Sequence, residues 1–182
     1  MGWLPHTVSI PPAEEIITPA EARAQTRIDG IDEDGVLLGY IEACREQIET
    51  YCSTKLITQT VIMRARCFDD FERFRTAPLQ SITAISYYDT SGNLQTLAPS
   101  VYEAVLLGLE PIVRLKYGQS WPAVWDVPDA IRVTAVAGYG DSEDVPGSIR
   151  QAALLTVASW AVDREIGELP DGAISLLTNY RV

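Results

Sequence analysis

Apolar residues recur at helical spacing in two long stretches of the chain, and each stretch predicts a helix. In residues 149–165, IRQAALLTVASWAVDRE, apolar side chains lie on almost every side, so this helix should be buried from more than one direction. It contains Arg150 and Gln151 and has only about 17 residues, which makes it too polar and too short for a membrane span. The chain is therefore expected to wrap this helix, either enclosing it as an ordinary core helix or leaving part of its surface to a partner.

A second stretch, residues 36–52, has one apolar stripe at three- and four-residue steps, so it is expected to pack against the first helix. Cys44 and Cys52 fall on this stripe and are interpreted as small core residues, not as nucleophiles. Three acidic residues are expected to lie largely away from the stripe: Glu42, Glu46 and Glu49. The pattern therefore predicts a pair of long, packed helices.

Residues 1–16 are rich in proline and show no periodicity, so they are expected to form an extended arm that is ordered only where something holds it. A short helix should follow. Thr18 can cap its N-terminus, Pro19 suits its first position, and Glu21 can complete a capping box. This helix is expected to end near Arg27.

The middle of the chain changes to a period of two, which is typical of strands. Strands are predicted at residues 60–68, 81–88, 94–97, 102–107, 112–117 and 131–137. Residues 89–93 predict a hairpin turn. The predicted fold class is therefore α+β, mainly a helical bundle of about four helices, with a β-strand insertion between the second and third long helical regions.

These patterns divide the chain into an extended arm (1–16), the helical part of the bundle (17–56), a β insertion (57–140), the central helix of the bundle (141–166) and a C-terminal docking tail (167–182). The tail turns at Gly167 and Pro170 and ends in an apolar, aromatic segment, which is typical of a docking peptide. Six tail residues are predicted to bind a partner: Ile174, Leu176, Leu177, Tyr180, Arg181 and Val182. The segment is equally compatible with a tail folded back on its own core.

The net charge of −11 argues against a general nucleic-acid clamp, because such proteins need a surplus of Lys and Arg. An acidic balance is compatible with a surface past which DNA slides without sticking. The three cysteines, Cys44, Cys52 and Cys67, form no recognisable disulfide framework and indicate a reducing compartment. Residues 1–12 lack a basic region followed by an apolar run, so no secretory signal is expected.

Residues suited to catalysis or metal binding are sparse. The single histidine, His6, lies in the extended arm, where a general base would have no fixed position. Asp32 and Asp34 resemble calcium-loop ligands, but the first and twelfth positions would be Gly30 and Ile41, which supply no carboxylate. We therefore predict no catalytic residue, no metal site and no cofactor.

Two alternative functions remain open. Asp69 and Asp70 form an acidic cluster that a small carboxylate-based hydrolase could use. Trp121 and Trp125 lie in one loop, and exposed tryptophans stack on sugars or bases, as in a monomeric binding module. Prolines in this loop favour packing over the sheet instead. Three phenylalanines are interpreted as flanking a solvated loop or as marking the edge of an interface: Phe68, Phe71 and Phe74.

Short motifs occur in a fixed order along most of the chain. They are residues 17–23 (ITPAEAR), 45–49 (REQIE), 56–60 (LITQT), 78–82 (PLQSI), 88–92 (YDTSG), 137–140 (AGYG), 145–146 (VP), 149–152 (IRQA), 164–165 (RE) and 180–181 (YR). This ordered set resembles the head–tail connector (adaptor) proteins of long-tailed bacteriophages and gene transfer agents. Members often have a glycine-containing turn where this chain has residues 53–55 (STK).

The resemblance implies a structural adaptor, not an enzyme, in the neck of a virion or phage-like particle made in the bacterial cytoplasm. It implies a homo-oligomeric ring of about twelve copies under the portal, which extends the DNA channel and joins the capsid to the tail-side stopper protein. DNA would pass without sequence-specific binding, and no membrane is involved. Residues 174–182 are expected to dock on the portal, and the β segment to lie on the outer side or tail-facing rim of the ring.

Overall fold

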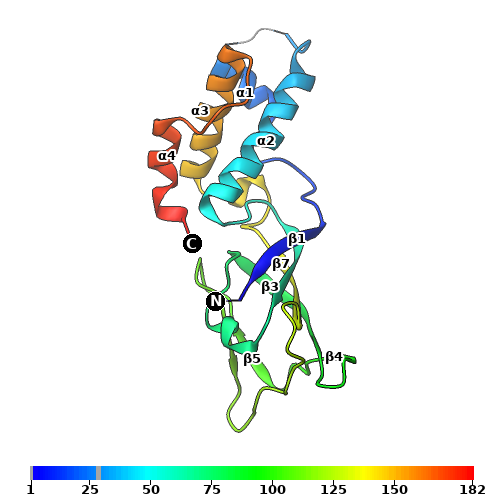
Figure 1. The fold of residues 1–182 in the computed structure, drawn as a ribbon. Coiled ribbons are helices and arrows are strands. Elements are labelled where there is room, and N and C mark those ends of the chain that lie inside the picture. Colours follow the sequence, from blue (N-terminus) through cyan, green and yellow to red (C-terminus); the bar gives the residue numbers. More distant parts are fainter. Residues whose placement is uncertain (1, 28–29) are drawn as a thin grey trace. The chain divides into compact units, whose positions relative to one another are not determined.

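The computed structural model describes residues 2–27 and 30–182, and in these residues the chain forms two compact units, each with its own hydrophobic core (Figure 1). The β unit consists of the described residues of Met1–Pro11 together with Thr58–Gly138. The helical unit consists of the described residues of Pro12–Ile57 together with Tyr139–Val182. The chain therefore runs from the β unit to the helical unit twice, and neither unit is continuous in sequence.

The helical unit is built around one central helix. Its α-helices are α1 (Pro19–Thr26), α2 (Asp34–Cys52), α3 (Gly147–Asp163) and α4 (Asp171–Leu177), with short 3-10 helices at Ser142–Asp144 and Thr178–Tyr180. Helix α3 packs against α1, α2 and α4 (Figure 1). It buries Ala152, Val157 and Trp160 among others, as expected for a helix that is apolar on almost every side. None of the helices in the described part of the chain is long and apolar enough to cross a membrane.

The start of α1 follows the predicted capping pattern. The Thr18 hydroxyl oxygen accepts a hydrogen bond from the Glu21 backbone N–H at 3.2 Å, and the Glu21 carboxylate accepts one from the Thr18 backbone N–H at 2.8 Å. The backbone hydrogen bond from Thr18 is the main cause that lowers the pKa of Glu21. The capping box is therefore confirmed, and it is a local signal because both partners lie within one turn.

Helix α2 ends because Ser53 adopts a left-handed backbone conformation, with φ of 56°. The Ser53 N–H donates to carbonyl oxygens of the last helical turn, those of Glu49 and Thr50. Only glycine adopts this conformation without a steric penalty. A serine therefore occupies a turn position for which glycine is better suited.

Replacing Ser53 with glycine is expected to raise the free energy of unfolding by about 0.5–1 kcal/mol, because it relieves the left-handed strain by more than it adds unfolded-state freedom. Urea unfolding of the two proteins measures the difference. The matched control is Thr50→Gly, one turn earlier in the helical conformation, which is expected to lower stability by about 0.5–1 kcal/mol. Equal effects of the two glycines would contradict the argument.

The β unit contains two antiparallel sheets within its described residues. The larger has the order β1-β2-β7-β3-β4 and the smaller pairs β5 with β6. The strands are β1 (Leu4–Ile10), β2 (Gln59–Ala65), β3 (Leu79–Tyr88), β4 (Leu94–Thr96), β5 (Tyr102–Val105), β6 (Ile112–Leu115) and β7 (Ile131–Ala137). Every second residue of β2 and β7 is buried, which places one face of the larger sheet on the core and leaves the other face outside it.

The α+β class is confirmed, but the expectation of a mainly helical bundle is wrong. The β unit is about as large as the helical unit and has its own core, in which Val61, Met63 and Val133 from the sheet meet a cluster of aromatic rings. Those rings come partly from the short 3-10 helix Phe68–Glu72, where a solvated loop was expected. Phe71 and Phe74 are fully buried, so they do not mark the edge of an interface. The prediction was wrong because long helical periods dominate the sequence pattern. The aromatic side chains that pack against the sheet lie in irregular segments, which show no period.

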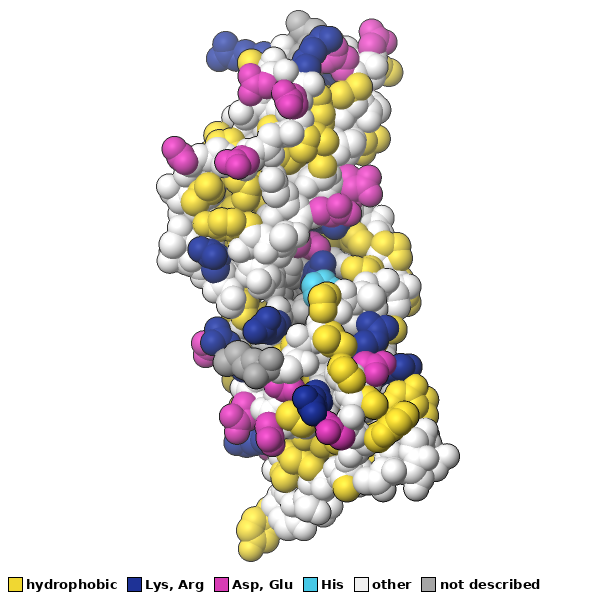
Figure 2. Space-filling view, viewed as in Figure 1, with side chains coloured by type: hydrophobic (Ala, Val, Ile, Leu, Met, Phe, Trp, Pro, Cys, Tyr) yellow, Lys and Arg dark blue, Asp and Glu magenta, His cyan; other side chains and the backbone are white. Residues whose placement is uncertain are grey.

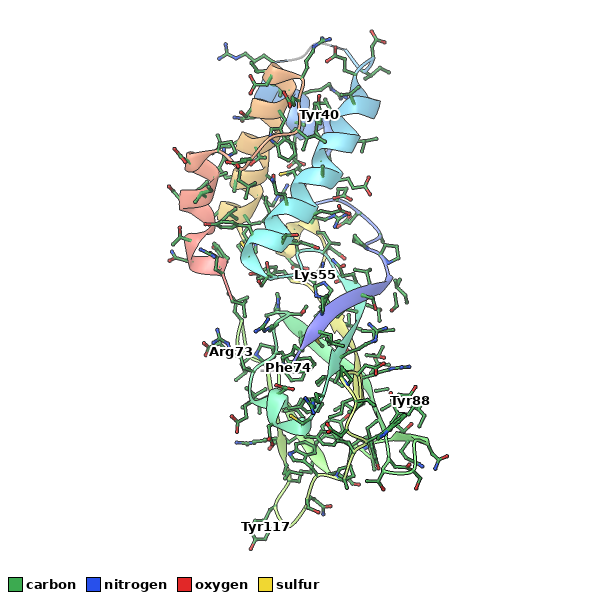
Figure 3. All side chains as sticks on the ribbon, viewed as in Figure 1. Tyr40, Lys55, Arg73, Phe74, Tyr88 and Tyr117 are labelled. Carbon is green, nitrogen blue, oxygen red and sulfur yellow. The ribbon has the colours of Figure 1, made fainter. Side chains whose placement is uncertain are left out.

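Much of the segment expected to be an extended arm is the edge strand β1, which pairs antiparallel with β2. Just before it, the Trp3 indole N–H donates to the carbonyl oxygens of Asp70 at 2.9 Å and Arg73 at 2.8 Å. The Trp3 ring centroid lies 4.8 Å from that of Phe74, which Figure 3 labels beside Arg73. The groups that hold the arm are therefore far from it in sequence, which explains why residues 1–16 show no pattern of their own.

Candidate partner-binding surfaces

The C-terminal segment folds back on the helical unit and contains all the residues predicted to bind a partner: Ile174, Leu176, Leu177, Tyr180, Arg181 and Val182. Leu177 is fully buried, and Ile174, Leu176 and Tyr180 are partly buried against the core. The Arg181 guanidinium lies 4.7 Å from the centroid of the Tyr51 ring, and the Val182 N–H donates to the Cys52 carbonyl oxygen at 3.0 Å. In the single chain the tail therefore lies on its own core, which is the alternative that the sequence left open.

Buried titratable side chains of the helical unit have raised pKa values. Burial is the main cause that raises the pKa of Tyr139 to about 12, with smaller contributions from Tyr180 and Cys52. Its hydroxyl is buried and has no hydrogen-bond partner among the described residues. Burial also raises the pKa of Cys52 to about 11 and that of Cys44 to about 12. Both cysteines therefore behave as core residues, since a reactive thiol needs a lowered pKa.

These raised pKa values predict a loss of stability at alkaline pH. The unfolded thiols release protons from about pH 9, whereas the folded thiols keep them up to pH 11 or above, so the stability they contribute is complete below pH 9 and is lost as pH rises. The expected slope is up to about 1.4 kcal/mol per pH unit for each thiol. Urea unfolding at pH values from about 8 to 10.5 measures it.

The control is the Cys44→Ala/Cys52→Ala double variant. It should be less stable than the parent at neutral pH, because two buried side chains are shortened. Its stability should nevertheless fall less steeply above pH 9. Identical pH slopes for the two proteins would show that these thiols do not carry the effect.

A buried network of charged side chains lies at the C-terminal end of α2, and the sequence analysis missed it. Glu49 was expected to point away from the apolar stripe but is only 5% exposed. Its carboxylate lies 2.6 Å from Lys55 Nζ and 3.7 Å from Arg45 Nη1, and it accepts a hydrogen bond from the Leu56 backbone N–H. Arg45 also pairs with Glu15 at 2.8 Å. Lys55 is labelled in Figure 3 just beyond the end of the helix.

This ion network ties together α2, the turn that follows it and the segment that precedes α1. Burial is the largest influence on Glu15 and raises its pKa in spite of the Arg45 guanidinium beside it. The charged groups of the network are paired with one another. Their role is therefore to hold these backbone segments in place, not to form a reactive site. The available sequence signal was the four-residue spacing of Arg45 and Glu49, which is typical of an ion pair on one helix face.

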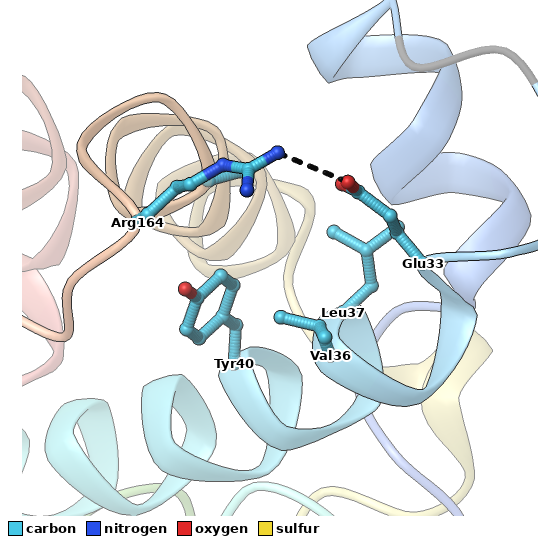
Figure 4. A pocket seen from close by; sticks show the side chains of 6 residues that line it. Glu33, Val36, Leu37, Tyr40 and Arg164 are labelled. Carbon is cyan, nitrogen blue, oxygen red and sulfur yellow. Dashed lines mark hydrogen bonds and ion pairs between the residues drawn. The ribbon is translucent and has the colours of Figure 1, made fainter.

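A shallow pocket lies between α2 and the end of α3 (Figure 4). It is lined by Glu33, Val36, Leu37, Tyr40, Ala161 and Arg164. Arg164 Nη2 lies 3.1 Å from a carboxylate oxygen of Glu33, and both side chains are exposed to solvent. The Glu33 carboxylate is exposed and already paired with Arg164, so the pocket gives no specific support for a catalytic role.

The acidic residues considered for hydrolysis or metal binding do not converge. Asp70 accepts a hydrogen bond from the Gly2 backbone N–H at 2.8 Å, while its neighbour Asp69 is exposed. In the candidate calcium loop Asp34 pairs with Arg23 and Asp32 is exposed, while Asp29, at the start of the same acidic turn, lies outside the described residues. Across residues 2–27 and 30–182, no group of three or more His, Cys, Asp or Glu side chains could hold a metal ion.

The two tryptophans of the proposed binding loop have different environments. The Trp121 ring stacks on Phe68, with centroids 4.6 Å apart, and packs against the β core. Trp125 is 49% exposed and meets Tyr88 edge-on. They therefore form no common stacking platform, and Trp121 is a packing residue.

The fold is that of a two-unit α+β protein. Within its described residues, the side chains considered for catalysis or ligand binding are paired with other groups, buried in a core, or too far apart to form one site. Residues 17–104, which run from before α1 into β5, match the family model described as Phage gp6-like head-tail connector protein. This match confirms the resemblance to head–tail connector proteins that the ordered motifs indicated. Among curated proteins, no match was found.

Solved structures with the same fold come from gene transfer agent (GTA) particles. A chain from the neck of an empty GTA particle, computed with C6 symmetry, has a TM-score of 0.82 and 20% identity, covering 98% of this chain and 96% of that chain. A chain from the virion of a native GTA particle has a TM-score of 0.79 and 23% identity, with coverages of 98% and 96%. A chain from the neck of a native GTA particle, computed with C12 symmetry, has a TM-score of 0.71 and 21% identity, with coverages of 95% and 94%.

At these identities the solved structures establish a shared fold. The family model and the solved structures are described as connector and neck proteins.

Proposed function

We propose that this protein is a structural head–tail adaptor in the neck of a tailed phage or phage-like particle. The match of residues 17–104 to the head-tail connector family carries the proposal. The fold shared with neck chains of GTA particles supports it over nearly the whole chain. In this function the protein acts by shape and surface, joining the capsid to the tail-side stopper protein, and DNA passes through it without sequence-specific binding.

The proposed assembly is a ring of about twelve copies under the portal. Similar chains were solved in necks with C6 and C12 symmetry, and a closed ring of identical chains needs two different, complementary surfaces on each copy. The net charge of −11 suits a channel wall that DNA must leave freely, because like charge keeps a polyanion from adhering.

The experiment that tests this function combines the full-length protein with the portal protein of its own particle. Mass measurement and electron microscopy are expected to show a ring-sized species of about twelve copies, on the portal or alone. A protein that stays monomeric with and without portal would contradict the proposal and would favour an independent binding module.

We also propose that the C-terminal segment docks on the portal. The contacts that hold its last residues on the helical unit are weak ones. The Arg181–Tyr51 stacking is worth about 0.5–1 kcal/mol at an exposed site, and the Val182 hydrogen bond about 1 kcal/mol. These residues can therefore leave their contacts with helix α2 and bind a partner instead, at a small cost in free energy.

Deleting residues 180–182 is expected to lower the affinity for portal at least tenfold, or about 1.4 kcal/mol, because the proposed anchor Tyr180 and the exposed Arg181 are lost. Circular dichroism should show a folded protein, because the buried Leu177 remains. Titration calorimetry with portal measures the affinity. The control is Tyr117→Ala, which removes a fully exposed aromatic side chain from a loop tip of the β unit (Figure 3) and should leave portal binding intact. Undiminished binding by the truncated chain would overturn the docking proposal.

A further inference from the structure

The larger sheet of the β unit has a face that lies outside the core of that unit. We call it the outer sheet face and define it by Thr60, Ile62 and Arg64 of β2 and Arg132, Thr134 and Val136 of β7. These residues are directly paired across the two strands, so their side chains share one side of the sheet. They are partly exposed, whereas the alternating residues of both strands are buried. The edge strand β1 extends the face with the exposed side chain of Ile10, which pairs with Thr60.

The charge on this face is opposite to that of the whole protein. The five strands of the larger sheet contain no Asp or Glu in their described sequence, and their charged side chains are Arg64 and Arg132. The β unit as a whole has seven Lys and Arg against eight Asp and Glu. The helical unit therefore carries a net charge of −10 out of −11. Figure 2 shows acidic side chains exposed over the helices.

The two arginines stand directly opposite each other on β2 and β7. Like charges at such a position destabilise a sheet. This repulsion is only partly compensated within the chain. Arg132 pairs with Asp129 at 3.1 Å and lies over the Tyr88 ring, but its Nε is buried without a hydrogen-bond partner among the described residues. Arg64 donates to the neutral Thr7 hydroxyl at 3.2 Å. An acidic partner would relieve this repulsion.

We propose that the outer sheet face of one copy binds the exposed side of α2 in a neighbouring copy of the ring, an inference that rests on the proposed adaptor function. Leu38, Glu42 and Glu46 follow one another at four-residue steps on that helix and are exposed. The two glutamates are about 6 Å apart along the axis, and directly opposed residues on neighbouring strands are about 5 Å apart. Two carboxylates can therefore face the two guanidiniums, while Leu38 covers the apolar part of the sheet.

The composition of the face favours this occupant over DNA. Ile10, Ile62 and Val136 make much of the surface apolar, and helices commonly cover the open face of a sheet. A DNA site needs more positive charge than two arginines within a unit of net charge −1. The helix face of a second copy supplies both the apolar and the acidic groups that the sheet face lacks.

The test separates assembly from folding by reversing one charge. Arg64→Glu is expected to keep or raise the melting temperature of the subunit, because it replaces the Arg64–Arg132 repulsion by attraction. The same variant should raise the protein concentration needed for half-assembly of the ring at least tenfold, measured by mass photometry with portal present if the wild type requires it. The control is Arg114→Glu, which makes the same charge change on β6 of the smaller sheet and should leave assembly unchanged.

The partner surface is tested by Glu46→Arg, on an exposed position of α2. As a single variant it should impair assembly, and the double variant Arg64→Glu/Glu46→Arg should restore assembly. Normal assembly by Arg64→Glu, equal loss in the Arg114→Glu control, or absence of rescue would overturn the inference while leaving the adaptor function standing. A ring that assembles normally but binds a short DNA duplex less tightly after Arg64→Glu would assign the face to DNA instead. A wild-type protein that never forms a ring would overturn both proposals.

Discussion

Replacing Glu49 with alanine is expected to lower the free energy of unfolding by about 3–5 kcal/mol, because it leaves the buried Lys55 ammonium without its carboxylate partner, whereas Arg45 keeps its pair with Glu15. The backbone N–H of Leu56 would lose its acceptor at the same time. Removing one member of a buried ion pair is more damaging than removing the pair, since the remaining charge has neither water nor counter-charge. Urea unfolding followed by circular dichroism measures the change.

The matched control is Glu46→Ala, in the same helix, where the side chain is 66% exposed. Its effect is expected to stay within about 0.5 kcal/mol, since exposed ion pairs contribute little. A further variant, Glu49→Gln, keeps the side-chain volume and a hydrogen-bond acceptor, so it should be less damaging than alanine. If Glu49→Ala and Glu46→Ala proved equally mild, the ion network would not be the structural anchor described above.

Replacing Phe71 with alanine is expected to lower stability by about 3–5 kcal/mol, because a large, fully buried ring leaves a cavity that its neighbours cannot fill. Four aromatic rings surround it: Trp3, Phe68, Phe74 and Trp121. Near-ultraviolet circular dichroism, which reports on the packing of these rings, should weaken together with the unfolding midpoint. The expected loss would therefore be seen in the β unit.

Trp125→Ala provides the control, since it removes a larger ring that is 49% exposed. It is expected to cost less than about 1.5 kcal/mol, because fewer packing contacts are lost. A Phe71→Ala variant as stable as the Trp125→Ala variant would show that the β unit does not depend on its aromatic cluster.

The elements that could be predicted from the sequence are those whose stabilising contacts are local or strongly periodic. The cap at Thr18 and Glu21 lies within one turn, and α3 has an apolar pattern over its whole length. Strand β1 lacks such a signal, because it is held by pairing with β2, about fifty residues away. Phe71 and Phe74 were misread for a related reason. Phe71 lies in a short 3-10 helix and Phe74 in the irregular segment after it, and neither has a long period that would mark an aromatic side chain as core.

The candidate surfaces were predictable only in part. The apolar tail residues form one sequence segment, so Ile174, Leu177 and Tyr180 were recognised together. Whether they cover their own core depends on Tyr51 and Cys52, which belong to another helix and give no signal in the tail. The ion network and the outer sheet face were missed because each arises only when separate segments come together. Arg64 and Arg132 become neighbours through the register of β2 and β7.

The order of segments along the chain has a consequence for biosynthesis. Helix α2 leaves the ribosome before the central helix that covers its apolar stripe, and Thr58–Gly138 must be translated in between. At about 5–20 residues per second, those roughly 80 residues delay the arrival of α3 by about 4–16 s. During that interval the stripe is open to chaperones or to misassembly with other nascent chains. Messages truncated before residue 139 should therefore give insoluble products, even though they encode every strand of the β unit.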